Sequence, residues 1–167
     1  MAILHIIDES EDTLRKTSRE VTEITPRILT LLDDMTETLH KAQGAGLAAV
    51  QVGVLRRIVL VEAEPGQLYE LINPKIVEKE GEQSEVEGCL SLPGQWGYTK
   101  RPQKVTVEAL NRKGEKVRYT GEGLLARAFC HEIDHLEGIL FDSIADHIMS
   151  EEELDEYYGS GSEEEEE

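Results

Sequence analysis

The sequence predicts a single domain that combines helices with antiparallel strands. Apolar residues recur with helical spacing in two segments, near residues 25–44 and 123–138. Between these segments lie short β-type runs separated by turn signals, and the last two runs flank the turn Asn111-Arg112-Lys113-Gly114. A chain of 167 residues with 39% hydrophobic residues is of single-domain size and can bury a core.

The first predicted elements are a surface arm and an amphipathic helix. Residues 8–20 are charged and irregular, and Leu14 is their one obvious core contact. Thr25 is a suitable N-cap, and Pro26 stands at the first helical position. The apolar positions that follow with helical spacing are Ile28, Leu32, Met35, Leu39 and Ala42. We expect this helix to end by Gly44 and its apolar stripe to pack on the core.

A glycine-rich stretch follows, from Gly44 to Gly53. Small residues packed this densely let another molecule's backbone approach closely, and Gln51 is the one polar side chain among them. The stretch also fits a turn that simply packs on the core. It is not a phosphate-binding loop, because no Gly-Lys-Ser/Thr follows it.

The middle of the chain is predicted to be strands. Residues 57–62 and 68–71 fit two antiparallel strands joined at Pro65-Gly66, and residues 75–79 and 84–86 fit two more after Asn73-Pro74. Residues 104–110 alternate with period two, and residues 116–120 return as the hairpin partner.

The second helix is predicted from Gly123 to Gly138. After a short link, a terminal acidic helix is expected to reach residue 158. Its inward-facing residues would be Ile144, Ile148, Leu154 and Tyr158.

The charge of the chain disfavours direct binding to nucleic acid. Lys and Arg number 17 against 35 Asp and Glu, which gives a formal net charge of −18. We expect residues 1–158 to form the domain, and residues 159–167 to be a flexible Gly/Ser linker with a poly-Glu tail, of the kind added to a protein for expression. Removing the five tail glutamates from −18 still leaves −13, so the domain itself is acidic.

Two cysteines do not form a disulfide framework, and a reducing compartment fits best. The first residues have neither the basic start nor the long apolar run of a signal peptide, and no later run reaches the length of a membrane span. We therefore expect a cytoplasmic monomer that does not contact a membrane.

The sequence His131-Glu132-Ile133-Asp134-His135 lies within the second predicted helix. Two histidines four residues apart share one helix face, so both can bind one metal ion while Glu132 reaches a water on it. The pattern indicates half of a hydrolytic metal site, although HExxH also arises by chance in charged amphipathic helices.

The third ligand separates the alternatives. One protease class continues as HExxHxxGxxH, but Phe141 stands where its last histidine would be. A second class takes a later glutamate, and residues 151–153 or Glu156 are available. The remaining donor is Cys89; a cysteine by itself favours core packing, but its neighbours Gly88 and Glu87 argue against that role. A Cys-His-His set would leave a fourth position open for water, as catalytic sites do.

Taken together, three motifs resemble those of the peptide deformylases. The family motifs GxGxAAxQ, EGCLS and HExDH correspond in order to residues 44–51, 87–91 and 131–135. The resemblance also includes Leu71-Ile72-Asn73-Pro74 and extends to about Phe141. It implies an α+β fold in which antiparallel sheets surround the HExDH helix, with the amphipathic helix before them and a short acidic helix at the end.

The resemblance implies a metal-dependent hydrolase that removes the formyl group from the N-terminal formyl-methionine of newly synthesised polypeptides and releases formate. The implied metal ligands are Cys89, His131 and His135. Fe²⁺ is favoured in the cell, with Zn²⁺, Ni²⁺ or Co²⁺ possible occupants. Glu132 would act as general base, while the Gln51 amide and the Leu90 backbone N–H would stabilise the oxyanion.

The implied substrate groove is lined by Gly44, Gly46, Leu47, Glu87 and Gly88. Glu87 would also pair with Arg101, and Asp134 would orient a ligand or cap the local backbone. Trp96 replaces an arginine that helps several members bind the peptide. The acidic end of the chain does not fit the basic docking helix of some members, so ribosome proximity would need another mode.

Two alternatives come from other classes. A zinc protease using a downstream glutamate would tolerate the loss of the Cys89 thiol. A non-catalytic relative that binds metal or peptide would lack turnover, which the presence of Glu132 argues against.

Overall fold

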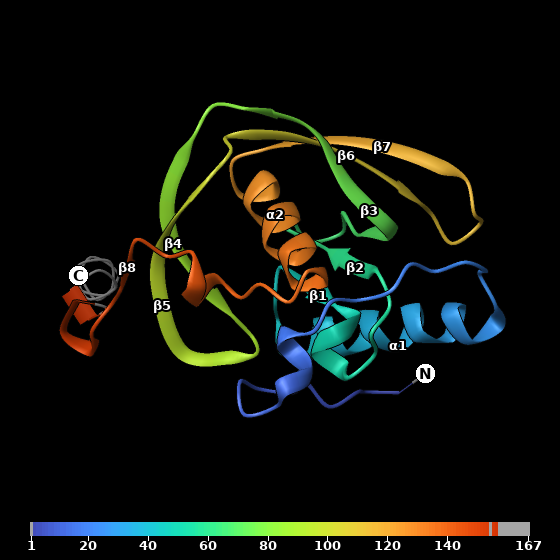
Figure 1. Ribbon diagram of the computed structural model, residues 1–167, viewed down its shortest axis with the longest axis horizontal. Helices are drawn as coiled ribbons and strands as arrows, with labels where there is room; N and C mark the ends of the chain where they lie inside the picture. The colour runs from blue at the N-terminus through green and yellow to red at the C-terminus, as the bar shows by residue number, and fades with distance from the viewer. Residues whose placement is uncertain (1, 154, 157–167) are drawn as a thin grey trace.

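A computed structural model describes residues 2–153 and 155–156 of the chain (Figure 1). The helices are α1 (Pro26–Ala42) and α2 (Leu124–Leu136), with short 3-10 turns at Asp12–Arg15, Ala49–Val52 and Phe141–Ser143. The strands are β1 (Gly46–Ala48), β2 (Ile58–Val61), β3 (Tyr69–Glu80), β4 (Gln83–Cys89), β5 (Leu92–Arg101), β6 (Lys104–Leu110), β7 (Lys116–Glu122) and β8 (His147–Ile148).

The strands form two antiparallel sheets. One has the order β1-β2-β3-β6-β7 and the other the order β4-β5-β8. Figure 1 shows α2 at the centre, between β4 and β5 on one side and the larger sheet on the other. The predicted α+β class, with sheets around the central helix, is confirmed.

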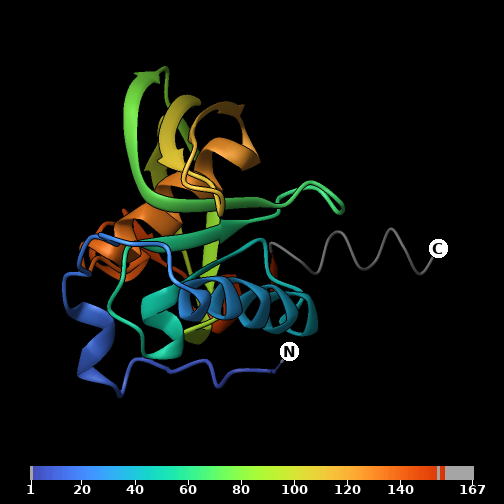
Figure 2. The same ribbon diagram turned by 90° about the vertical axis from the view of Figure 1, so that its right-hand side faces the viewer.

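Alternation along the larger sheet explains how it separates the two helices. In β2, Ile58 and Leu60 belong to the cluster that includes the α1 residues Leu32, Met35 and Leu39. The alternate residues Val59 and Val61 belong to the cluster that includes the apolar residues of α2. Both faces of β2 are therefore covered, which is why all four of its residues are apolar and fully buried. Figure 2 shows α1 lying along one side of this sheet.

Helix α1 forms as predicted. The Thr25 hydroxyl accepts a hydrogen bond from the Ile28 N–H at 3.4 Å, and Pro26 begins the helix. The helix ends at Ala42, where Gln43 takes a left-handed conformation with φ 55°.

Two strand predictions were wrong because turn signals misled them. The chain does not break at Asn73-Pro74; instead β3 continues from Tyr69 to Glu80 through a register shift. Asn73 has φ 52°, and its side chain accepts from the Val21 N–H and donates to the Val21 carbonyl, both at 2.8 Å. It thereby attaches the N-terminal arm to the sheet. Strand β5 was not predicted, because Pro93, Gly94 and Gly97 weaken its pattern.

The terminal segment also differs from the prediction. After α2 the chain forms a 3-10 turn and the short strand β8, and among the described residues that follow β8, residues 151–153 and 155–156 are helical. Ile144 and Ile148, which were expected to face inward, are 40% and 42% exposed. Leu154, Tyr158 and the tail at 159–167 lie outside the described residues. Among the described helices, none is both long and apolar enough to cross a membrane.

Candidate active site

Three side chains converge where α2 meets the end of β4. The Nε2 atoms of His131 and His135 lie 3.2 Å apart, and the Cys89 sulfur lies 3.3 Å from His135 Nε2. All three donor atoms lie within 4.8 Å of one another. Within the described part of the chain, these residues are the one group of His, Cys, Asp and Glu side chains arranged to hold a metal ion.

The chemistry of these donors fits a cation. His131 directs its Nδ1 toward Glu87, at 2.6 Å from Oε2, so Nε2 is the nitrogen that faces the site. Burial lowers the pKa of His131, but Glu132, Cys89 and Glu87 together raise it well above its usual value. The site therefore favours a positive charge at this nitrogen, whether a proton or a metal ion. Burial and the neighbouring His131 lower the pKa of His135, which favours the neutral imidazole that a metal requires.

Glu87 holds the first histidine in place from β4. Its carboxylate accepts two hydrogen bonds from Arg101, at 3.1 and 2.6 Å, so the structure contains the predicted ion pair. Burial would raise the pKa of Glu87, but the hydrogen bonds from His131 and Arg101 lower it below its usual range. Asp134 pairs with Arg101 at 2.5 Å rather than with either histidine.

Glu132 lies on the pocket side of the two histidines. Its Oε2 atom is 3.9 Å from His131 Nε2, and burial raises its pKa to about 7. Gly46 on β1 makes room for this carboxylate, because a Cβ built on Gly46 would lie 2.5 Å from Glu132 Oε2. The position of the Glu132 carboxylate therefore requires a residue without a side chain at Gly46.

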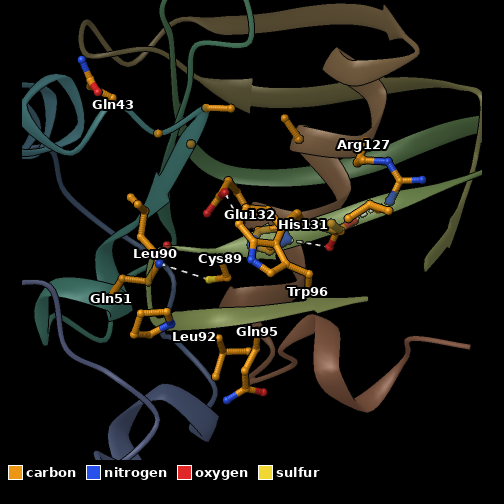
Figure 3. A pocket seen from close by; sticks show the side chains of 18 of the residues that line it. Gln43, Gln51, Cys89, Leu90, Leu92, Gln95, Trp96, Arg127, His131 and Glu132 are labelled. Atoms are coloured by element: carbon orange, nitrogen blue, oxygen red, sulfur yellow. Dashed lines mark hydrogen bonds and ion pairs between the residues drawn. The ribbon is translucent and has the colours of Figure 1, made fainter. Parts of the chain in front are cut away.

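Gln51 is fully oriented by its neighbours. Its side-chain oxygen accepts from the Ala48 N–H at 2.9 Å, so the amide nitrogen points the other way. That nitrogen donates to the Ser91 hydroxyl at 3.1 Å and lies 3.6 Å from the Cys89 sulfur. In Figure 3, Gln51 and Leu90 lie beside Cys89 on one side of the pocket.

These groups open onto a pocket of about 520 Å³ (Figure 3). The predicted site residues that line it are Gly44, Gly46, Gln51, Glu87, Gly88, Cys89, Leu90, His131 and Glu132. Trp96 forms part of the wall and lies across Gly88, where a Cβ would collide with its ring. Leu47 is a predicted groove residue that does not line the pocket, because its side chain packs in the core toward α1.

Among the described residues, neither the glutamates at 151–153 nor Glu156 joins the group of candidate metal ligands. Phe141 stacks on His131, with ring centroids 6.4 Å apart and planes at 28°. Glu153 instead contacts His147 Nε2 at 2.6 Å. Cys130 is buried in the α2 core cluster, and burial raises its pKa to about 11.

Three polar residues around the site were not predicted: Ser91, Thr99 and Arg127. Ser91 contacts Gln51, while Thr99 and Arg127 donate to Glu87 at 2.8 and 2.7 Å. A signal for Arg127 exists in the sequence, since it precedes His131 by four residues and so shares its helix face.

Comparison with known proteins agrees with this geometry. The family model described as polypeptide deformylase matches residues 3–152. The chain belongs to this deformylase family. The peptide deformylase of Acetivibrio thermocellus is 55% identical over 155 residues, which are 93% of this chain and 91% of that protein. That of Caldanaerobacter subterraneus is 53% identical over 155 residues, 93% of this chain and 97% of that protein.

Solved deformylase structures share the fold. The crystal structure of peptide deformylase from Thermotoga maritima has a TM-score of 0.84 at 32% identity, covering 88% of this chain and 100% of that one. The Legionella pneumophila structure has a TM-score of 0.83 at 36% identity, covering 96% and 98%. The chain is thus a deformylating, metal-dependent hydrolase, and the protease alternative is not favoured.

Proposed function

We propose that the chain removes the formyl group from the N-terminal formyl-methionine of newly synthesised polypeptides and releases formate. The observation that carries this proposal is the convergence of Cys89, His131 and His135 beside Glu132 and Gln51, at the base of an open pocket. Family membership at about 50% identity supports it.

The metal ligands in this proposal are Cys89, His131 and His135. When bound, a divalent ion there supplies Lewis-acid chemistry, which lowers the pKa of a water and polarises a carbonyl oxygen. We propose Fe²⁺ as the ion in the cell, while a donor set of one thiolate and two imidazoles also suits Zn²⁺, Ni²⁺ and Co²⁺.

Glu132 is the proposed general base. Among the described residues its Oε1 atom has no hydrogen-bond partner, so this oxygen is free to bond a water or the substrate. A pKa raised to about 7 lets the same carboxylate accept the proton of the attacking water and return it to the leaving amine.

Gln51 and the Leu90 backbone N–H are the proposed donors to the oxygen of the formyl group. The fixed rotamer of Gln51 supports this role, because its amide nitrogen is directed toward the Cys89 end of the pocket before any substrate arrives. Such preorganised donors need little rearrangement as negative charge develops.

The peptide is proposed to bind in extended form along the pocket. Strands β1 and β4 are edge strands of their sheets, and Gly46 and Gly88 on them line the pocket. An added strand could hydrogen-bond to such an edge. Gly44 precedes β1, and Leu47 on β1 and Glu87 on β4 are proposed to contribute to this groove through their backbone. Trp96 supplies an apolar wall where an arginine was expected.

The setting of the reaction follows from its substrate. We propose that the chain works in the cytoplasm as a single-domain monomer over residues 1–158, near ribosomes but without a basic docking helix, and without direct contact to nucleic acid or membrane.

The test is anaerobic purification with metal analysis, followed by formate release from formyl-Met-Ala. We expect about one metal ion per chain and one formate released for each formyl-Met-Ala consumed. No release from metal-loaded protein would overturn the proposal. Cys89→Ser should lose the metal and the activity together. Full retention of the metal in this variant would show that Cys89 is not a ligand, and retained metal without formate release in the unchanged chain would favour the downstream-glutamate protease.

A further inference from the structure

Arg127 is the most deeply buried cation beside the site that has no assigned role. It lies on α2 one turn before His131, and only 6% of its side chain is exposed. Its guanidinium donates to Glu87 Oε1 at 2.7 Å and to the Thr99 carbonyl at 3.0 Å, and it also contacts the Thr99 hydroxyl. A buried arginine with this many directed bonds holds its partners in fixed positions.

Those bonds divide the two oxygens of Glu87 between different tasks. Oε1 accepts from Arg127, Thr99 and Arg101 Nε. Oε2 accepts from Arg101 Nη2 and from His131 Nδ1, both at 2.6 Å. Since Oε1 is anchored from several directions, the carboxylate cannot rotate, and Oε2 stays aimed at the histidine.

Charge balance gives a second, independent reason for Arg127. Arg101 is shared between Glu87 and Asp134, so these three residues alone carry a net charge of −1. Adding Arg127 brings the cluster to zero. Buried charges are costly unless neutralised, so Arg127 lets Glu87 remain a carboxylate without drawing Arg101 away from Asp134.

We propose that Arg127 is a positioning residue for the metal centre. It anchors Glu87, which fixes the tautomer and ring orientation of His131, so that Nε2 stays directed at Cys89 and His135. The inference rests on the proposed metal ligands. Partners that bond a metal ligand directly, as Glu87 does, typically change the metal affinity by about 10 to 100-fold when they are lost, and Arg127 acts through this partner.

The test compares three variants with the unchanged chain, all loaded with Co²⁺. Arg127→Met keeps an apolar stem but removes charge and donors, and Arg127→Lys keeps the charge but not the forked geometry. Arg118→Met is the matched control. Arg118 lies on β7 and forms exposed ion pairs with Glu78 on β3 and Glu108 on β6. The measurements are Co²⁺ affinity by chelator competition and the visible absorption spectrum of the bound cobalt.

We expect Co²⁺ to bind Arg127→Met about 10-fold more weakly, at the lower end of the range for direct partners of a metal ligand, with a shifted cobalt spectrum. Arg127→Lys should recover part of the affinity, and Arg118→Met should match the unchanged chain. Affinity and spectrum unchanged in a folded Arg127→Met would overturn the inference. If that variant does not fold, Arg127→Lys decides: unchanged affinity and spectrum there refute the forked-geometry role.

Failure of the proposed function would look different. In that case the unchanged chain itself would bind no Co²⁺ through a thiolate, or would release no formate from formyl-Met-Ala. An unaltered chain that does both, alongside an unaffected Arg127→Met, removes only the role of Arg127.

Discussion

The two helices of this fold differ in how much of their surface is buried. Helix α1 buries one stripe that includes Leu32, Met35 and Leu39, while most of its other residues are partly buried or exposed. Helix α2 is buried on nearly every side, because both sheets pack around it. Its buried residues include four that carry polar or ionisable groups: Arg127, His131, Glu132 and His135.

The difference shows what each helix depends on. The apolar stripe and the Thr25 cap of α1 lie within one local segment, so local sequence determines this helix. Helix α2 begins at Gly123 with no side-chain cap, and the partners of its buried polar groups lie on β1, β4 and β5. Its buried polar residues are tolerated because distant segments supply their hydrogen-bond and ion-pair partners.

The largest effect should come from removing the acid chemistry of α2 without changing its packing. Glu132→Gln is nearly isosteric, so metal content and fold should be retained while turnover falls by about 100 to 10,000-fold. Formate release from formyl-Met-Ala measures the loss, and metal analysis provides the control. Near-full activity would remove Glu132 from the mechanism.

The next largest effect should be a loss of stability when the carboxylate of Glu87, which pairs with Arg127 on α2, is removed. Glu87→Gln leaves Arg101 and Arg127 buried without their shared carboxylate, which should lower the free energy of unfolding by about 3 to 5 kcal/mol. Urea denaturation measures this change. The matched surface variant Glu78→Gln, which loses an exposed pair with Arg118, should change it by about 1 kcal/mol or less. Equal effects of the two variants would contradict the contrast.

Gly46→Ala should disturb the fit between β1 and α2. The new Cβ would lie 2.5 Å from Glu132 Oε2 and displace this carboxylate, so kcat/KM should fall by about 100-fold while the metal is retained. Gly44→Ala is the comparison, because its nearest neighbour is the flexible end of the Leu90 side chain at 2.8 Å. A greater loss in Gly44→Ala than in Gly46→Ala would show that this packing argument is wrong.

The smallest effect belongs to α1. Thr25→Ala removes its cap and should lower the free energy of unfolding by about 1 kcal/mol. Activity should not change, since Thr25 does not line the pocket. Thermal unfolding and formate release, measured on the same sample, check both statements, and a marked loss of activity would show that α1 is coupled to the site.

The sequence predicts the elements whose patterns are local. Helices α1 and α2 and the hairpin of β6 and β7 were predicted because their apolar patterns lie within single segments. Strand β5 was missed because Pro93, Gly94 and Gly97 interrupt its alternation, and pairing with β4 overrides that weak local preference. Strand β3 continues through Asn73, whose side chain is hydrogen-bonded to Val21. A pattern read from the residues next to Asn73 could not predict this distant contact.

The site shows a similar limit. The motif residues could be recognised in the sequence because their types and spacing are unusual. Arg127 and Thr99 were not recognised, and Ser91 was given no role although it closes the EGCLS motif, because an arginine, a threonine and a serine acquire their roles only from the distances that the fold imposes. Their partners lie on other segments, as Arg127 on α2 and Thr99 on β5 do for Glu87 on β4.

The N-terminal arm has a consequence for the order in which the protein matures. Ser18 donates its N–H to the Leu136 carbonyl at the end of α2, and Ile7 donates its N–H to the Gln51 carbonyl. A ribosome releases the arm first and Leu136 among the last residues of the domain, so the first residues synthesised must wait for nearly the whole chain before they can dock. The ligands Cys89 and His135 are themselves 46 residues apart. Contacts of such long range slow folding, and the three ligand side chains can meet only after synthesis has passed His135.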